Sequence, residues 1–402
     1  MAQNKSRYAQ RGVSSGKAEV HAAITGLDQG IFPGAFCKVL PDILGGDTDW
    51  CNIKHADGAG TKAGLAYLFW KTTGRRINVW KGIIQDSLVM NLDDLGCVGT
   101  TGPFIVSSAI GRNKALIPGE VVAQLIAGGE ELFAMLRKYG IECRNAGGET
   151  ADLGDLVRTI VIDNDIVTRM PRADVIDASN ITAPALIVGF SSTGQAIWED
   201  APNSGIGSNG LTNARHDTLG PDYREHTETF APETEIDLVY SGKFHLLDPL
   251  PRDDQFTIGS ALLSPTRTYL PLIAYLFEKM GRAKFLGFIH CSGGGQTKIG
   301  KFGQRGIVYI KDNLFPTPPL FQMLQEVREL PWREMYESYN MGHRLEAVVK
   351  TQKDADLCIK YAESLGIGAR IVGRVEKNLG NSVGRSVVIQ HNNMEFAYPF
   401  DA

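Results

Sequence analysis

The sequence predicts an α/β fold with mixed (α+β) sheets arranged in two domains. Strand-like apolar runs alternate with helical segments along most of the 402 residues, a length typical of two domains. A polar, strand-poor stretch at 171–182 separates two such sets. Glycine accounts for 45 residues and gathers in short polar turns, where backbone-lined ligand sites form. We therefore expect one domain over residues 1–175 and a second over 176–402.

Hydrophobic periodicity places the individual elements of both sets. The first set is a strand at 51–57, helices at 63–71, 80–95 and 118–138, and strands at 141–145 and 157–170. The second set has strands at 185–190, 285–289, 347–349 and 369–375 and helices at 270–280, 320–329 and 355–365. Residues 214–260 are polar and weakly periodic, which predicts a surface excursion rather than a third domain.

Composition and charge exclude several classes of protein. A net charge of −4 provides no basic footprint, so a nucleic-acid partner is not expected. Six cysteines lie singly, without metal or disulfide spacing, and are expected to be reduced. The polar N-terminus lacks the apolar stretch of a signal peptide, and no run is long and apolar enough to span a membrane. The expected location is the cytoplasm.

The hexad Asp57-Gly58-Ala59-Gly60-Thr61-Lys62 follows a strand and combines the groups that a nucleotide-phosphate site needs. Gly58 and Gly60 let backbone N–H groups approach a ligand, and Lys62 can meet phosphate oxygens as a point charge. Asp57 can hold a divalent cation. The Walker A pattern occurs nowhere in the chain, and a plain glycine-rich turn is the alternative.

Acidic residues gather at the ends of elements in the first 155 residues. Asp86, Asp93 and Asp94 lie on helix 80–95, where a solvated helix face is the alternative interpretation. Glu149 follows Gly147-Gly148 at the expected end of a strand, although a plain turn would also fit. If several of these acids converge, their repulsion favours a bound cation, and Mg²⁺ bridging ATP phosphates suits an oxygen-only cluster.

Three glycine-containing loops of the second half carry further polar groups. The Gly-x-Gly-x-x-Gly match at 205–210 lies far from the strand ending near residue 190, so it predicts a polar turn at Ser208-Asn209-Gly210 and not a dinucleotide site. Residues 290–298 place His290 and three successive glycines after a strand, which predicts an anion-binding nest. The third loop is 339–344. Its Arg344 could bind phosphate or carboxylate, or lie in a surface turn.

In this order the motifs resemble the phosphoribosylformylglycinamidine cyclo-ligase (aminoimidazole ribonucleotide synthetase) family of purine biosynthesis. The matching segments are 8–13, 57–62, 89–95, 147–151, 208–210, 262–267, 290–295 and 335–342. The resemblance implies that family's two-domain fold and a homodimer in which the N-terminal domains share a barrel. It also implies the ATP-dependent closure of formylglycinamidine ribonucleotide to aminoimidazole ribonucleotide through a phosphorylated amide, with release of ADP and phosphate.

The resemblance further implies roles for individual residues, with ATP as co-substrate and Mg²⁺ as cofactor. The implied catalytic residues are Lys62, Asp94, Glu149 and His290, and the implied metal ligands are Asp57, Asp86 and Asp94. ATP phosphates would meet Gly58, Gly60, Thr61 and Lys62. The phosphoribosyl substrate would meet Ser208, Asn209, Gly210, Ser292, Gly293, Gly294 and Gly295.

The chain departs from the family pattern in three places. The family usually carries a histidine before Ser-Asn-Gly, where this chain has Gly207, so His216 or His290 would have to replace it or the activity would be lost. The stretch 32–37 is altered and the excursion at 214–260 is longer. Two rivals follow: a related kinase acting on another small molecule such as thiamine monophosphate, and a non-catalytic nucleotide-binding relative.

Overall fold

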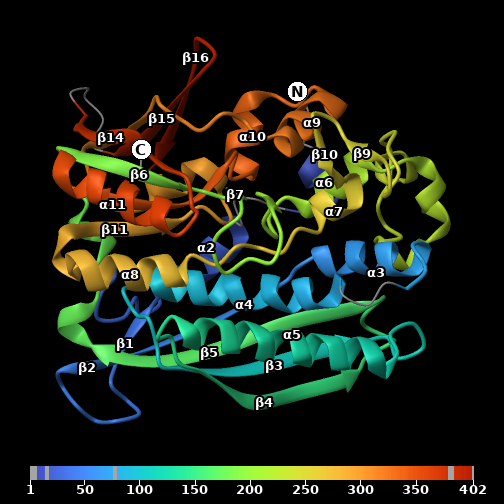
Figure 1. Cartoon of the computed structure of the whole chain (residues 1–402), viewed down its shortest axis with the longest axis horizontal. Helices are drawn as coiled ribbons and strands as arrows, with labels where there is room; N and C mark the ends of the chain where they lie inside the picture. Colours follow the sequence, from blue (N-terminus) through green and yellow to red (C-terminus); the bar gives the residue numbers. More distant parts are fainter. Residues whose placement is uncertain (1–6, 14–17, 76–78, 379–383, 401–402) are drawn as a thin grey trace.

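The computed structural model describes residues 7–13, 18–75, 79–378 and 384–400. The polar residues 1–6, which entered the signal-peptide argument, lie outside this part of the chain. Two main sheets lie on either side of a layer of helices, and helix α4 (Val79–Cys97) runs through the middle of the molecule (Figure 1). The predicted α/β architecture with mixed sheets is confirmed. The predicted boundary at residue 175 falls between the two sheets.

The first sheet has five strands in the order β1-β2-β5-β3-β4. Their bounds are Val39–Pro41 (β1), Trp50–Gly58 (β2), Phe104–Arg112 (β3), Cys143–Asp152 (β4) and Ile160–Pro171 (β5). Strands β3 and β4 are parallel and the other neighbours antiparallel. Helices α4 and α5 (Gly119–Lys138) pack on one face, and α3 (Lys62–Thr72) follows β2 (Figure 1). The opposite face exposes Ile105 and Val161.

The second sheet has seven strands in the order β11-β13-β6-β14-β12-β15-β16. Their bounds are Ala185–Ser191 (β6), Phe285–His290 (β11), Ile307–Lys311 (β12), His343–Val349 (β13), Ala369–Lys377 (β14), Arg385–His391 (β15) and Met394–Phe400 (β16). The helices of this part are α8 (Leu270–Met280), α9 (Pro319–Arg328), α10 (Trp332–Ser338), α11 (Gln352–Ser364) and the 3₁₀ helix η7 (Gly295–Lys301). Helix α11 packs on β6 and β14, and α8 packs on both α11 and α4.

Shorter elements complete the described chain. They are α1 (Arg7–Gln10), α2 (Ala18–Ile24), α6 (Leu211–Thr218), α7 (Ile258–Leu262), β7 (Thr193–Gly194), β8 (Asn203–Ser204), β9 (Pro249–Leu250), β10 (Asp253–Thr257) and the 3₁₀ helices η1 (Arg172–Asp174), η2 (Ala178–Asn180), η3 (Pro221–Glu225), η4 (Thr227–Thr229), η5 (Ile236–Leu238) and η6 (Arg282–Lys284). None of the described helices combines the length and the apolar character that crossing a membrane requires.

Helix α4 corrects the interpretation of its acidic side as a solvated face. Sixteen of its nineteen residues are buried, Asp86, Asp93 and Asp94 among them. The apolar arc packs on the first sheet and α5, as its periodicity predicts, while residues of the second half of the chain cover the acidic side. Periodicity reports only which residues are apolar, so it could not show that a second layer closes over the polar side.

The structure corrects two further predictions: the bounds of one strand, and the description of residues 214–260 as a surface excursion. The strand predicted at 141–145 begins at Cys143 and runs on to Asp152, because β4 pairs with β3 on both sides of a bulge that follows Val106, and this pairing sets Glu149 opposite Ala109. Glu149 therefore lies within a strand and not beyond its end. The stretch 214–260 is not merely a surface excursion, since Val239, Tyr240 and Leu246 are buried in the main core.

Candidate functional site

Lys62 and Asp86 form a fully buried ion pair between the first turn of α3 and the middle of α4. The Lys62 Nζ donates to Asp86 Oδ1 at 2.8 Å and to the Ser264 carbonyl at 2.6 Å. Both side chains have 0% exposure. Burial lowers the pKa of Lys62, and the negative charge of Asp86 opposes that shift. This pair joins the first half of the chain to the segment that precedes α8.

Two carboxylates of α4 hold that same segment through its backbone. Asp86 Oδ1 accepts from the Thr266 backbone N–H at 2.8 Å and from its hydroxyl at 2.6 Å. Asp93 accepts from the Thr268 hydroxyl at 2.7 Å and from the Tyr269 backbone N–H. Burial raises the pKa of Asp93 despite these donors. Asp86 and Asp93 therefore fasten the two halves of the molecule together.

Asp94 starts a chain of buried hydrogen bonds that leaves α4 in another direction. His290 Nδ1 lies 2.6 Å from Asp94 Oδ1, and Arg344 Nε lies 3.1 Å from His290 Nε2. An arginine nitrogen can only donate, so His290 accepts at Nε2 and donates its ring proton from Nδ1 to Asp94. Burial raises the pKa of Asp94, but the bond from His290 and nearby positive charge outweigh burial and leave that pKa below its usual value.

His55 lies on the other side of Asp94. Its Nε2 is 3.4 Å from Asp94 Oδ2, and its Nδ1 is 2.8 Å from Asn91 Oδ1. The Asn91 amide nitrogen donates to the Asp57 carbonyl at 3.0 Å, so its oxygen is the acceptor and His55 donates from Nδ1. The His55 side chain keeps 22% exposure and so connects the buried Asp94 to solvent.

The predicted phosphate loop begins with the last two residues of β2, Asp57 and Gly58, and ends at Lys62, the first residue of α3. Asp57, Gly60 and Thr61 are exposed, while Lys62 turns inward. The Thr61 hydroxyl is 2.9 Å from that of Thr212 on α6, so the loop meets the helix that begins after Ser208-Asn209-Gly210. The structure thus brings the Asp57–Lys62 loop to the N-terminus of α6.

The two predicted substrate loops also meet. A Cβ built on Gly293 would lie 3.7 Å from Asn209 Oδ1, which is ordinary contact distance across the two loops. Gly210 precedes α6 with φ of 76°, and Gly295 opens η7 with φ of 51°. Both glycines contact Tyr339. The turn at 208–210 and the loop at 292–295 therefore face each other at the seam between the two halves.

Glu149 is not joined to these groups by any hydrogen bond or ion pair of the described residues. It lines a separate cavity of about 160 Å³ between α5 and strands β3 and β4. Nor do the described residues contain a cluster of three or more His, Cys, Asp or Glu side chains arranged to hold a metal ion. Asp86 already receives an ammonium and two other donors. The assignments of Glu149 and of the three metal-binding acids stay predictions.

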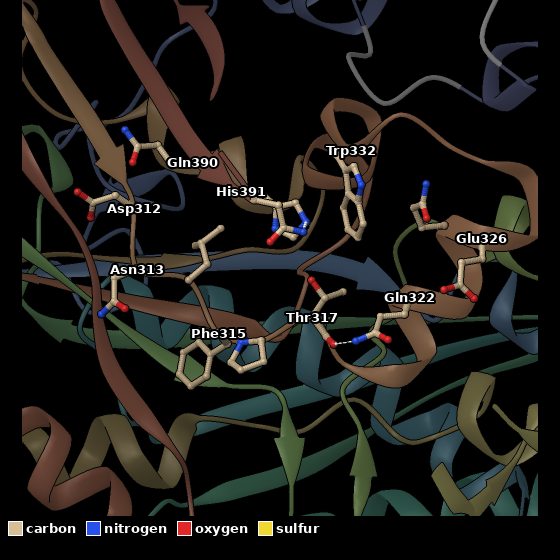
Figure 2. Close-up of a pocket in the computed structure, with 13 residues that line it drawn as sticks. Asp312, Asn313, Phe315, Thr317, Gln322, Glu326, Trp332, Gln390 and His391 are labelled. Carbon is tan, nitrogen blue, oxygen red and sulfur yellow. Dashed lines mark hydrogen bonds between the residues drawn. The ribbon is translucent and has the colours of Figure 1, made fainter. Parts of the chain in front are cut away.

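A larger hollow of about 550 Å³ lies in the C-terminal part, away from these loops. Figure 2 shows that Trp332, His391 and Phe315 line it together with many polar side chains. Several of those polar groups bond within the protein, such as Gln322 to the Thr317 carbonyl. Asp312 pairs with Arg374 in the same way. The hollow shares no lining residue with the predicted site.

Sequence reasoning missed three residues of this site. His55 drew no notice because it sits in a strand, although it lies two positions before Asp57 and so on the same strand face. Asn91 lies within the segment 89–95 that resembles the family, and Thr212 follows the Ser208–Gly210 turn by two positions, but neither was given a role. Arg344, weighed mainly as part of a surface turn, is 1% exposed in β13. His216, a suggested proton carrier, is buried with its Nδ1 accepting from the Tyr240 backbone.

The fold of the chain is similar to that of solved proteins. It superposes on AaThiL complexed with AMPPCP and TMP with a TM-score of 0.53, at 11% identity over 92% of this chain and 93% of that one. A HypE-HypF complex gives a TM-score of 0.53, at 11% identity over 96% and 99% of the two chains. Such low identity establishes the fold alone.

Sequence comparison gives the more particular likeness. The chain is 27% identical over 352 residues to phosphoribosylformylglycinamidine cyclo-ligase of Methanocaldococcus jannaschii, covering 86% of this chain and 84% of that protein. The enzyme of the same name from Thermoplasma acidophilum is 26% identical over 324 residues, covering 81% and 79%. No protein-family model matches the chain. The similarity to the cyclo-ligases that the motifs predicted is confirmed.

Proposed function

We propose that this protein is an ATP-dependent cyclo-ligase of purine biosynthesis, which closes formylglycinamidine ribonucleotide to aminoimidazole ribonucleotide and releases ADP and phosphate. The observation that carries the proposal is the meeting of the Ser208–Gly210 turn with the glycine loop at 292–295, beside the Asp94–His290 pair. These residues lie in three of the eight segments that resemble the cyclo-ligase family. The similarity in sequence to enzymes of that name supports it.

For the proposed reaction the protein must position ATP and formylglycinamidine ribonucleotide and must remove a proton. Transfer of the γ-phosphoryl group to the formamide oxygen would convert that oxygen into a leaving group. The amidine nitrogen then attacks the same carbon, and phosphate departs as the ring closes. In phosphoryl transfer a protein contributes mainly alignment and charge stabilisation. The exposed loop 57–61 would hold the ATP phosphates, and the facing loops at 208–210 and 292–295 the phosphoribosyl group.

His55 is suited to accept the amidine proton. Asp94 keeps its carboxylate ionised because His290 donates to it, and His55 Nε2 lies 3.4 Å from that carboxylate with access to solvent. Asp94 would stabilise the charge on a protonated His55, from which the proton could leave to solvent. His290 itself has both nitrogens bonded to protein groups, so its proposed role is to fix the orientation of Asp94.

Mg²⁺ would be held by oxygen ligands of this site together with the ATP phosphates. The oxygen donors at hand are Asp57, which is exposed at the end of β2, and Asp94. Magnesium commonly takes only one or two protein carboxylates and otherwise phosphates and water, which fits this sparse set. When bound, the ion would neutralise charge on the transferred phosphoryl group. Asp86 is better explained by its bond to Lys62.

A second copy of the chain is the proposed partner, and the cytoplasm the proposed location. The face of the first sheet opposite α4 and α5 exposes Ile105 and Val161, at 52% and 37%. Apolar side chains on an uncovered sheet face favour burial against another surface. Sedimentation of the full chain tests the dimer.

Turnover with a panel of substrates tests the function. ADP release should require formylglycinamidine ribonucleotide together with ATP and Mg²⁺, and should yield one aminoimidazole product per ADP. Thiamine monophosphate serves as the control, since a kinase of this fold would phosphorylate such a molecule without ring closure. Absence of stimulation by the amidine, or stimulation by thiamine monophosphate in its place, would reject the cyclo-ligase.

A further inference from the structure

Arg344 is a buried cation that lacks a carboxylate partner. Its side chain is 1% exposed, and within the described residues it takes part in no ion pair of 4.0 Å or less. Its Nε donates to His290 and one terminal nitrogen to the Arg267 carbonyl, but the buried Nη1 has no hydrogen-bond partner among the residues that the structure describes. Buried charges in proteins are normally paired, because an unpaired one loses its hydration with no compensation.

The neighbouring Arg267 provides the contrast. It is equally buried, yet its guanidinium bonds to Glu199 and to the carbonyls of Ser191, Thr193 and Gly194. A fully paired arginine of this kind is explained by the fold alone. Arg344 is not, since one of its donors points to no protein acceptor.

The free end of Arg344 lies at the Ser208 turn. A Cβ built on Gly207 would be 3.6 Å from Arg344 Cδ and 3.7 Å from Nη1. A methyl group at position 207 would already be in van der Waals contact with the Arg344 side chain, so a larger side chain has little room on that side. The glycine that departs from the family pattern thus leaves Arg344 room to reach this turn. The Ser208 hydroxyl, next along the chain, is also buried without a partner.

We propose that Arg344 Nη1 and the Ser208 hydroxyl bind the oxygens of a phosphoryl group at the turn 207–210. A phosphoryl group has several acceptor oxygens, and here an arginine donor, a hydroxyl, the N-terminus of the eight-residue α6 and the glycine loop at 292–295 approach one place. The bound anion supplies the charge partner that Arg344 lacks. Arg344 thereby determines which anionic substrates the site accepts.

This inference rests on the proposed function only for the source of the phosphoryl group. That group is either the phosphate carried on the ribose of the substrate or the one transferred from ATP. Binding measurements without turnover separate the two. A protein that binds phosphate through Arg344 but fails to cyclise the amidine would refute the proposed function and leave this inference intact.

The experiment compares Arg344→Met with the wild type by calorimetry, using ribose 5-phosphate in one arm and MgADP with vanadate in the other. We expect Arg344→Met to weaken one of the two by at least about tenfold, because a charge-assisted hydrogen bond is lost. Loss in the first arm identifies the ribose phosphate, and loss in the second the transferred group. Binding within twofold of wild type in both arms would overturn the proposal.

Matched variants separate binding from folding. Arg169→Met removes an arginine of the first sheet that pairs with Asp42, and should leave both affinities unchanged. Arg344→Met also loses the bonds to His290 and to the Arg267 carbonyl, so its own Tm is the baseline, and ribose 5-phosphate or MgADP–vanadate should raise that Tm less than they raise the Tm of the wild type. Should Arg344→Met fail to fold, Gly207→Val keeps the arginine but fills the space before it, and is expected to lose binding to the same extent. Unaltered binding in Gly207→Val would equally overturn the proposal.

Discussion

The buried pair of Lys62 and Asp86 allows a test that separates a structural role from a catalytic one. The perturbations are Lys62→Met, Asp86→Asn and the two together. Lys62→Met leaves the Asp86 carboxylate buried with only the Thr266 N–H and hydroxyl as donors. Asp86→Asn leaves the ammonium facing only neutral oxygens, one of them the Ser264 carbonyl. Each single change strands a charge with 0% exposure.

The expected magnitudes follow from that burial. Removing one member of a buried pair costs about 3–5 kcal/mol, most of it the penalty of the uncompensated charge that remains. The double variant strands no charge, so it should be more stable than either single variant, and its loss should fall short of the sum of the two single losses by at least about 3–5 kcal/mol. Urea unfolding curves measure the change in the free energy of unfolding for each of the three variants. Losses that add to within about 0.5 kcal/mol would show that the two side chains do not interact as the structure has them.

Turnover of the same three variants decides whether Lys62 also serves the reaction. If Lys62 only joins α3 to α4 and the segment before α8, the double variant should recover ADP release along with its stability. If Lys62 contacts the ATP phosphates in the working enzyme, its removal should reduce turnover by at least about 10²-fold in both the single and the double variant. The second result, with stability restored, would favour the role that the hexad first indicated.

Three further predictions follow from other contacts of the site. Asp94→Asn should lower turnover by at least about 10²-fold through loss of its negative charge, with little change in Tm; a near-normal rate of ADP release would contradict its role. Burial lowers the pKa of His216 below its value in the unfolded chain, so folding favours the neutral imidazole. The free energy of unfolding should therefore be highest above about pH 6.5. It should fall by about 1.4 kcal/mol per pH unit as the pH is lowered further. His216→Asn keeps an acceptor for the Tyr240 N–H, and its urea midpoint should fall less steeply between pH 6.5 and 5; equal slopes would contradict the assignment. Gly295→Ala should abolish binding of ribose 5-phosphate, because its Cβ would lie 2.6 Å from the Tyr336 and Tyr339 carbonyls, whereas Gly293→Ala meets only Asn209 at 3.7 Å and should retain the fold; equal binding by the two would refute this difference.

Much of the architecture could be read from local patterns. The alternation of strands and helices predicted the mixed α/β fold, and the elements around α4, α5 and α8 were placed to within a few residues. Of the two main sheets, strands β1, β3, β12, β15 and β16 were not predicted. Strand β12 pairs with β14 and β15, which are distant in sequence, and such pairing leaves little local signal, whereas β15 and β16 form a hairpin with each other.

The sequence predicted the loops and acidic residues of the candidate site, but not which side chains contact one another. The glycine loops were found because a turn that needs positive φ, as at Gly210 and Gly295, restricts the residue types allowed there. The partners of each acid could not be found in this way. Asp86 meets Thr266 and Asp94 meets His290 across separations of 180 and 196 residues, which no local pattern encodes.

The amino-acid sequence by itself determined the fold class, the glycine turns and the likeness to the cyclo-ligases, because each depends on residue types at short spacing. Only the tertiary structure decided which charged side chains are paired with other groups of the described chain and which keep an unpaired hydrogen-bond donor. Asp86 forms an ion pair with Lys62, and Asp94 accepts a hydrogen bond from His290. Arg344 Nη1 has no acceptor among the described residues. The physical reason is that pairing and burial depend on what lies across the seam between the two halves of the chain.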